Sequence, residues 1–336
     1  MAILGGAELC FPQLINISCK KSMQLHSENI FVYVLLSCIS FVTVTLNLLV
    51  IISISHFRQL HTPTNIFLLS LAVSDFLVGL LLMPFRLLLT EGCWVLGSLM
   101  CALFNFISFI ITSASVGNMV LISADRYVAI CDPLHYQTKI TNWRVKICVC
   151  VCWLCSVFYN GVILKDHLKN PDIYNSCYGE CVLLIELLIG VFDLILTFIG
   201  PITVIIVLYM RVFVVAVSQA QALRSHVASV TLQGSVPVTA KKSERKAATA
   251  LGVVVLVFIL GFCPYYYPAF TGHELVSSEV FSNLGIWLFY FNSCLNPIIY
   301  AFFYPWFRKS LKHIVTLQIL HQLSQYFNLF YLLGLL

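Results

Sequence analysis

Seven long apolar segments dominate the chain and constrain its fold more than any other feature. They cover residues 30–55, 66–89, 98–124, 145–164, 182–210, 247–270 and 281–304. Each is near or above the ~18–20 residues that a helix needs to cross a bilayer. Only 10% of the 336 residues are charged and 60% are apolar, against about a quarter and about half in soluble domains. Segments in hydrocarbon must satisfy their own backbone hydrogen bonds, so we expect an all-α integral membrane protein, a seven-transmembrane helix bundle.

The distribution of Lys and Arg predicts the orientation of this bundle. With the N-terminus outside, external segments carry five of the 19 Lys and Arg residues and internal segments carry the other fourteen, and cytoplasmic loops are normally the basic ones. We expect an extracellular N-terminus over residues 1–29, a seven-transmembrane domain over 30–304, and a cytoplasmic amphipathic eighth helix and tail over 305–336. Asn16 begins an external Asn-Ile-Ser triplet, which makes it a candidate glycosylation site.

One marker residue or motif falls in each predicted helix, in a fixed order. The markers are Asn47, Leu71-Ala72-Val73-Ser74-Asp75, Asp125-Arg126-Tyr127, Trp153, Pro201, Pro264 and Asn296-Pro297-Ile298-Ile299-Tyr300. Together, over residues 30–316, they resemble the rhodopsin-like (class A) G-protein-coupled receptors. The pattern Asn292-Ser293-x-x-Asn296-Pro297-x-x-Tyr300-x-x-x-Tyr304-x-Trp306-Phe307 is similar to the fingerprint of the trace amine-associated receptors. The segment Cys177-Tyr178-Gly179-Glu180-Cys181 and Tyr290 also fit that family.

This resemblance carries the functional expectation. Receptors of that family are mostly olfactory sensors of volatile amines in the plasma membrane, and they raise cyclic AMP through a stimulatory G protein. The implied partners are an organic amine, a heterotrimeric G protein of the stimulatory or olfactory type, arrestin, a receptor kinase and membrane lipid, without nucleic acid. We expect no enzyme, because the sequence shows no nucleophile–base pair or phosphate loop. A serotonin-like biogenic amine receptor is the alternative within the class, and an ion-coupled transporter is the alternative outside it.

Two positions depart from the family pattern. The third helix usually has an Asp seven residues after its outer cysteine, here Cys101, and Ser108 stands at that position. The sixth helix usually reads Cys-Trp-Cys-Pro, where this chain has Phe262 in place of Trp. An acid lies instead at Asp193, in the fifth predicted helix, and a fish branch of the family shows the same exchange. We expect Asp193 to pair with the ligand ammonium; the alternative is a structural carboxylate bonded to neighbouring helices.

Further pocket residues are implied around this anchor. Glu186 lies seven residues before Asp193, which on a helix is two turns up the same face, ~10 Å along the axis. Two such carboxylates suit a di- or polyamine; the alternative is a solvated residue at the helix mouth. Aromatic side chains fall where the family's pocket lies: Phe109, Phe262, Tyr265, Tyr266, Trp287 and Tyr290. They offer either cation–π contacts or packing, and we expect Phe262 to be a packing switch below the ligand.

Two polar clusters are implied deeper in the bundle. The resemblance implies a sodium pocket, whose oxygen ligands suit a hard cation, built from Asp75, Ser115, Asn292, Ser293 and Asn296. The alternative is a polar network without an ion, and no other cofactor is expected. At the inner end the resemblance implies a G-protein switch in which an arginine is held by its neighbour until activation. Its members are Asp125, Arg126, Tyr127, Tyr209, Asn296, Pro297 and Tyr300.

External cysteines are expected to form disulfides, because that compartment is oxidising. Six of the 14 Cys fall outside: Cys10, Cys19, Cys93, Cys101, Cys177 and Cys181. By resemblance, Cys101 pairs with Cys181 and Cys19 with Cys177, with Cys10 as the rival of Cys19. This leaves Cys93 without a partner.

Overall fold

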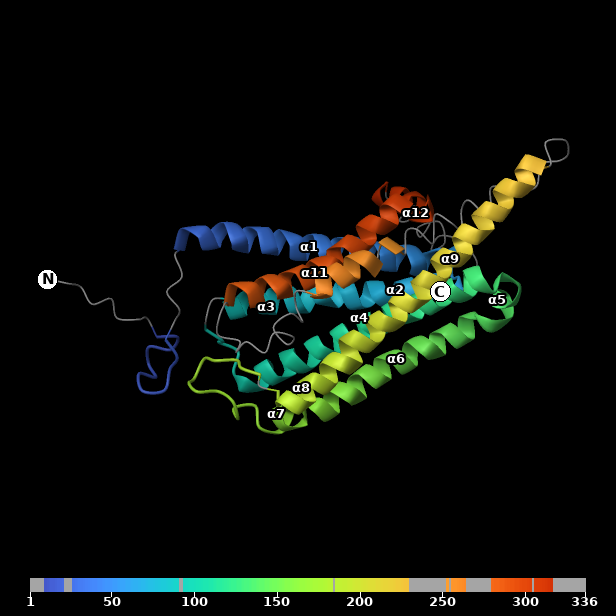
Figure 1. Ribbon diagram of the computed structural model, residues 1–336. Coiled ribbons are helices and arrows are strands. Elements are labelled where there is room, and N and C mark those ends of the chain that lie inside the picture. Colours follow the sequence, from blue (N-terminus) through green and yellow to red (C-terminus); the bar gives the residue numbers. More distant parts are fainter. Residues whose placement is uncertain are drawn as a thin grey trace, which may run out of the picture.

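The computed structural model describes residues 9–20, 26–90, 93–183, 185–229, 252–253, 255–263, 279–303 and 305–316. The helices of the predicted spans run lengthwise in one elongated bundle (Figure 1). These are α1 (His26–His56), α2 (Pro63–Leu77), α3 (Met83–Thr90), α4 (Ser98–Cys131), α6 (Asn142–Ile163), α8 (Leu187–Leu194), α9 (Gly200–Ser229) and α11 (Glu279–Phe303). Within or between them lie η1 (Arg58–Leu60), α5 (Pro133–Lys139), α7 (Lys165–Lys169) and the π-helical turns η2 (Val78–Leu82) and η3 (Ile195–Ile199), and α12 (Pro305–Val315) follows the last span.

The described helices account for most of the predicted spans. Five are long and apolar enough to cross a membrane: Tyr33–His56, Pro63–Leu89, Ser98–Cys131, Asn142–Ile163 and Leu188–Val215. They coincide with the first five predicted segments, and α11 coincides with the seventh. α12 turns away from α11 by 101°, as expected of an eighth helix. Within the sixth segment, residues 252–253 and 255–263 are helical, and the rest lies outside the described residues.

Two predicted helix boundaries were wrong. The third helix, expected over 98–124, continues to Cys131, because polar residues at the membrane boundary keep their helical hydrogen bonds until Pro133 disfavours helix at the preceding residue. The fifth span was expected from residue 182, but α8 begins at Leu187. Cys181 is disulfide-bonded to Cys101 of α4, and this bond keeps the residues between Cys181 and Leu187 out of the helix.

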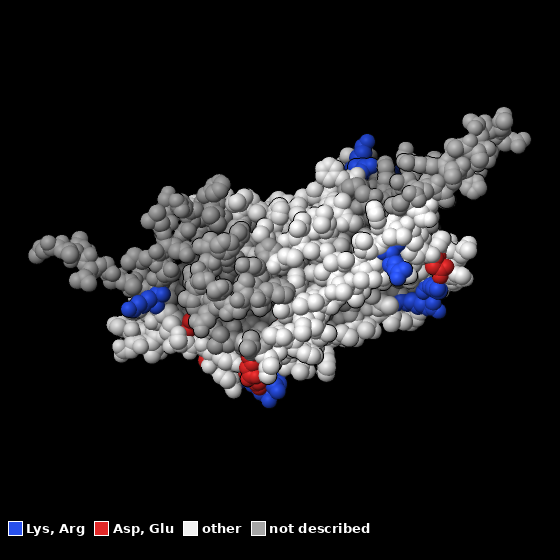
Figure 2. All heavy atoms as spheres, viewed as in Figure 1, with Lys and Arg blue, Asp and Glu red and all other residues white. Residues whose placement is uncertain are grey.

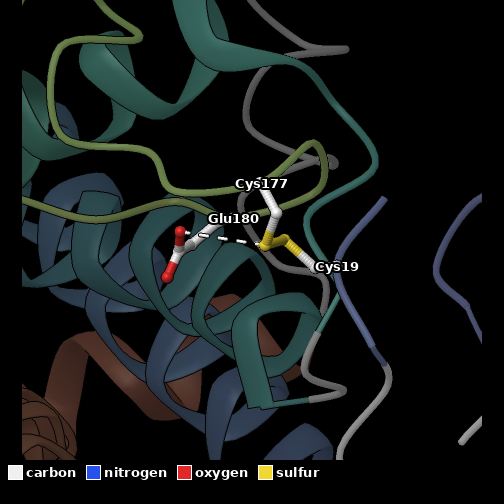
Figure 3. A group of neighbouring side chains, drawn as sticks. All are labelled: Cys19, Cys177 and Glu180. Carbon is white, nitrogen blue, oxygen red and sulfur yellow. Dashed lines mark hydrogen bonds between the residues drawn. A yellow bond between two sulfur atoms is a disulfide. The ribbon is translucent and has the colours of Figure 1, made fainter. Parts of the chain in front are cut away.

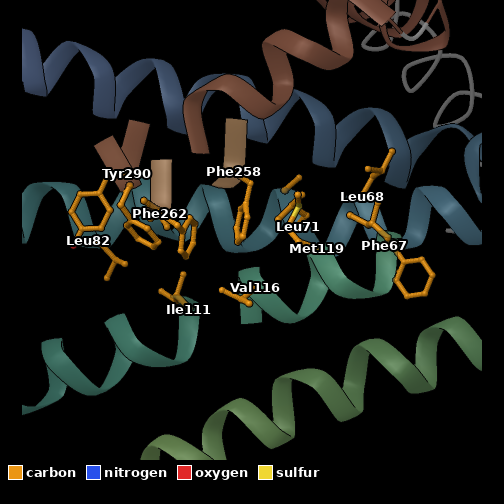
Figure 4. Close-up of a cluster of buried hydrophobic side chains, with 14 of the residues drawn as sticks. Phe67, Leu68, Leu71, Leu82, Ile111, Val116, Met119, Phe258, Phe262 and Tyr290 are labelled. Carbon is orange, nitrogen blue, oxygen red and sulfur yellow. The ribbon is translucent and has the colours of Figure 1, made fainter. Parts of the chain in front are cut away.

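Side chains distinguish a packed interior from a lipid-facing surface. Where α2, α4, residues 255–263 and α11 converge, apolar side chains form one buried cluster, with Leu68, Met119, Phe258 and Phe262 at most 2% exposed (Figure 4). By contrast, Phe158 on the outer side of α6 is 76% exposed. Charged side chains lie near the two ends of the molecule, with a wide uncharged band between them (Figure 2). Soluble proteins rarely expose so large an apolar area, so the band is the membrane-facing surface.

Candidate functional site

Asp193 lies in the last turn of α8 and is directed towards α6. The Tyr159 hydroxyl donates a hydrogen bond of 2.9 Å to Oδ1 of Asp193. The Thr197 hydroxyl donates to the backbone carbonyl of Asp193 at 2.7 Å. Within the described residues this acid has no Lys, Arg or His partner. The site therefore holds a half-buried carboxylate without a counter-charge of its own.

The chain around Asp193 is shaped by Pro201. A proline has no N–H to donate to the carbonyl four residues earlier, so a regular helix is interrupted there. The π-helical turn η3 precedes α9 in this stretch, and such turns locally re-aim side chains. Asp193 lies directly above that turn, which sets the direction of its side chain.

Glu186 begins the helix that carries Asp193. It is the N-cap of α8, with φ −56° and ψ 142°, its side chain is exposed, and its carbonyl accepts a hydrogen bond of 2.8 Å from Gly190 N–H. A second carboxylate contact to the amine from Glu186 stays a prediction. The exposed position agrees with the alternative, a solvated residue at the mouth of the bundle.

The Ser108 hydroxyl is buried on α4 and has no hydrogen-bond partner within the described part of the chain. A buried hydroxyl is normally hydrogen-bonded. The hydrogen-bonding capacity of this hydroxyl is therefore unused among the described residues. Phe109, the next residue, is partly exposed.

Of the aromatic residues predicted for the pocket, those described in the sixth and seventh helices pack in or against the buried core. Phe262 packs between Phe258 and Phe289, with ring centroids 4.0 and 4.4 Å apart, which places it in the core as the packing interpretation expected. Tyr290 is 6% exposed and its ring lies 5.8 Å from that of Trp287. The two other predicted residues, Tyr265 and Tyr266, lie outside the described residues.

Two residues of the predicted sodium pocket are in direct contact. Asp75 is 2% exposed and accepts a hydrogen bond of 2.7 Å from Asn296 Nδ2. The amide oxygens of Asn292 and Asn296 are buried without a hydrogen-bond partner among the described residues. Unpaired oxygens around a carboxylate fit a hard cation such as sodium. Ser115 is buried on α4.

Sequence reasoning missed two members of this polar layer. Asn47 Nδ2 donates to the Ser293 carbonyl at 3.0 Å, so it links α1 to α11. Asn118 is fully buried, and neither of its amide atoms has a partner in the described residues. Both carried a usable signal, because polar side chains inside apolar spans are costly and mark functional positions.

At the inner end, Arg126 is held by its neighbour as expected. Its Nε donates to Asp125 Oδ2 at 3.0 Å, and the two side chains form an ion pair. Thr64 donates to the same oxygen at 2.9 Å and Tyr136 donates to Oδ1 at 2.8 Å. Thr64 and Tyr136 were not predicted. Burial and the nearby Asp125 charge raise the pKa of Tyr136 to about 12, so it stays a donor at any physiological pH.

The other residues predicted for the switch differ in burial. Tyr300 is fully buried, Asn296 and Pro297 are buried on α11, and Tyr127 and Tyr209 are partly exposed. The described structure thus has Arg126 in its locked arrangement.

Three disulfides fasten the outer surface. Cys101–Cys181 and Cys19–Cys177 are present, as the resemblance implied. The expectation that Cys93 lacks a partner was wrong, because it is bonded to Cys10. The chain between Cys10 and Cys19, here called the N-terminal strap (residues 10–19), is therefore fixed at both ends.

Backbone hydrogen bonds join the strap to the second outer loop, the segment between α6 and α8 (residues 164–186). Cys19 N–H donates to the Tyr178 carbonyl at 2.9 Å, and Tyr178 N–H donates to the Ile17 carbonyl at 2.7 Å. Asn16 is exposed on the strap. The Glu180 carboxylate lies 4.0 Å from Cys177 Sγ (Figure 3). Both nearby sulfurs belong to a disulfide, so this group offers no thiolate to a metal ion.

Comparison with known proteins identifies the family. Residues 46–300 match the family described as 7 transmembrane receptor (rhodopsin family). The chain is 40% identical to trace amine-associated receptor 13c of Danio rerio, over 96% of both chains. It is 37% identical to receptor 7e of Mus musculus, over 97% of this chain and 93% of that one, and 36% identical to receptor 6 of Pan troglodytes, over 98% and 97%. The chain belongs to the trace amine-associated receptors.

Membership in this family establishes the overall architecture and the general function of the chain. The receptor is a seven-transmembrane bundle in the plasma membrane, and it is a signalling protein rather than an enzyme.

Proposed function

We propose that this receptor is an olfactory chemoreceptor for organic amines that raises cyclic AMP through a stimulatory G protein. The observation that carries the proposal is the half-buried Asp193 carboxylate, which has no protein cation beside it in the described residues. A charge in a membrane span is costly unless a partner neutralises it, and an ammonium group supplies that partner. Ser108, whose hydroxyl has no partner on the described chain, supplies a second polar contact on α4.

Several accessory features belong to the same proposal. Sodium binds among Asp75, Ser293 and Asn296 and favours the resting state, because the cation adds to contacts that hold α2 and α11 together. Asn16 carries a glycan on the exposed strap. Arrestin and a receptor kinase end the signal at the inner face, and α12 lies against membrane lipid.

A panel of amines in cells with a cyclic AMP reporter tests the main proposal. The panel contains straight-chain monoamines and α,ω-diamines of three to eight carbons, with the corresponding alcohols as uncharged controls. We expect at least one amine, and none of the alcohols, to raise cyclic AMP. Transcripts in olfactory sensory neurons test the tissue. A receptor that responds to none of the amines would contradict the proposed ligand class. Expression only outside olfactory tissue would contradict the olfactory role.

The Asp193→Asn variant tests the anchor. This change keeps shape and hydrogen bonding but removes the charge, and loss of a desolvated ion pair costs ~2–5 kcal/mol, a thirtyfold or greater rise in half-maximal concentration. Asp193→Glu moves the carboxylate by one methylene and should be milder. An unchanged dose–response curve for Asp193→Asn, at equal surface expression, would show that Asp193 is not the counter-ion of the amine.

A further inference from the structure

Tyr159 contacts Asp193 but has no role in the sites described above. It lies on α6, and its hydroxyl donates to Oδ1 of the carboxylate at 2.9 Å. Within the described residues, Tyr159 is the side chain that reaches this carboxylate from another helix. Thr197, whose hydroxyl donates to the backbone carbonyl of Asp193, lies one turn further along the same span as Asp193.

The neighbouring residue anchors the same turn of α6. Asn160 is fully buried and its Nδ2 donates to Ser113 Oγ of α4 at 3.0 Å. Two successive side chains therefore tie α6 to α4 and to α8. Because Asn160 fixes the position of this turn, the Tyr159 hydroxyl is a pre-set donor rather than a freely moving one.

We propose that Tyr159 is a positioning residue for the amine, holding the Asp193 carboxylate in the orientation that meets the ligand's ammonium group. This inference rests on the proposed function of Asp193. A phenol donor stabilises a carboxylate without neutralising it, because it brings no positive charge. The ion pair remains available to the ligand, while rotation of the carboxylate about its last torsion, which is otherwise broad, is restricted.

The Tyr159→Phe variant removes the hydroxyl and little else. Hydrogen bonds to charged groups contribute more than neutral ones, so we expect the half-maximal amine concentration to rise about tenfold. Ser156→Ala is the matched control, because it removes a hydroxyl of α6 that donates to the Cys152 carbonyl of the same helix and makes no hydrogen bond to Asp193 in the described structure; its curve should stay within about twofold of wild type.

A double-variant cycle separates positioning from a merely structural role. Tyr159→Phe, Asp193→Asn and the double variant are compared with the most potent amine of the panel, with surface expression and thermal melting measured in parallel. If Tyr159 positions the charge, Tyr159→Phe shifts the wild-type curve but adds less than about twofold to Asp193→Asn, since no charge remains to be oriented.

Three results overturn the inference. One is equal shifts from Tyr159→Phe in both backgrounds, another is a loss of surface display or melting temperature without a change in potency, and the third is an unchanged curve. If Asp193→Asn itself leaves potency unchanged, the proposed anchor fails. If Asp193→Asn shifts the curve and Tyr159→Phe does not, the role assigned to Tyr159 fails alone.

Discussion

The Tyr136 hydroxyl donates a hydrogen bond of 2.8 Å to Oδ1 of Asp125, the carboxylate that pairs with Arg126. Thr64 occupies the other oxygen at 2.9 Å. Both oxygens of Asp125, which is 1% exposed, are thereby engaged. The short inner helix α5 thus helps to fix the carboxylate that holds the arginine in its resting place.

Tyr136→Phe should raise ligand-free signalling. Removing one donor from a buried carboxylate weakens the arrangement that restrains Arg126, so the open state gains population; we expect a rise of about two- to fivefold, as for ~0.5–1 kcal/mol. Cyclic AMP is measured without amine at matched surface expression. Thr138→Ala is the control, because its hydroxyl donates only to a backbone carbonyl of α5. A basal signal no higher than that of the control would show that Tyr136 does not restrain the switch.

The outer disulfides should differ in their importance. Cys101→Ala or Cys181→Ala should abolish surface display and response, because this bond ties α4 to the loop that leads into α8. The pair Cys10→Ser and Cys93→Ser should retain both, since Cys19–Cys177 still holds the strap, but should lower stability by ~2–4 kcal/mol. Surface labelling and thermal melting decide. Full display of Cys101→Ala, or loss of display in the Cys10/Cys93 variant, would contradict this ranking.

These outer bonds also mark a limit of sequence reasoning. The pairs with a family precedent were foreseen, but spacing alone cannot assign the partners of six cysteines, so Cys10–Cys93 was not. Intramembrane acids such as Asp75 and Asp193 were visible, because charge stands out in an apolar span. Tyr159 was missed, since a tyrosine near a membrane boundary is indistinguishable from an interface residue until its hydroxyl is seen to reach Asp193. The start of α8 at Leu187 was not foreseen, because the disulfide at Cys181 holds the chain that leads into it.

Gly117 should tolerate no side chain while Cys152 stays in place. A Cβ added at Gly117 would clash with Cys152 Sγ, at the close contact of α4 with α6. Gly117→Ala should therefore destabilise the receptor by ~1–3 kcal/mol, as overpacking does. Cys152→Ala removes the clashing sulfur, so the double variant should recover most of the melting temperature. Failure of this rescue would place the cost elsewhere than in this contact.

Acidification should loosen the second outer loop through His167. Its imidazole is 2% exposed in α7, and neither ring nitrogen has a hydrogen-bond partner in the described structure. Burial lowers the pKa of His167 from its ordinary 6.5, so the folded loop prefers the neutral ring. Its stabilising contribution is complete above about pH 6.5 and is lost as the pH falls from there towards the lowered pKa.

Thermal melting of the purified receptor at pH 7.5 and 5.5 measures this effect. On acidification, the melting temperature of the wild type should fall by about 2 °C more than that of His167→Phe. The variant keeps an aromatic ring near Tyr174 but cannot be protonated. Parallel losses in the two proteins would assign the pH effect to other groups.

Ser108→Asp should change which amines the receptor prefers. Ser108 stands where related receptors usually have their acid, and its buried hydroxyl has no partner in the described chain. An added carboxylate on α4 would offer the second end of a diamine a counter-ion in addition to Asp193. A monoamine can neutralise only one of the two charges, and an unpaired buried charge is costly. Diamines should therefore gain potency relative to monoamines of equal length, by about tenfold or more. Dose–response curves for both series, with Ser108→Asn as the uncharged control of equal size, decide the matter. The same preference in Ser108→Asn and Ser108→Asp would mean that the charge at this position does not reach the ligand.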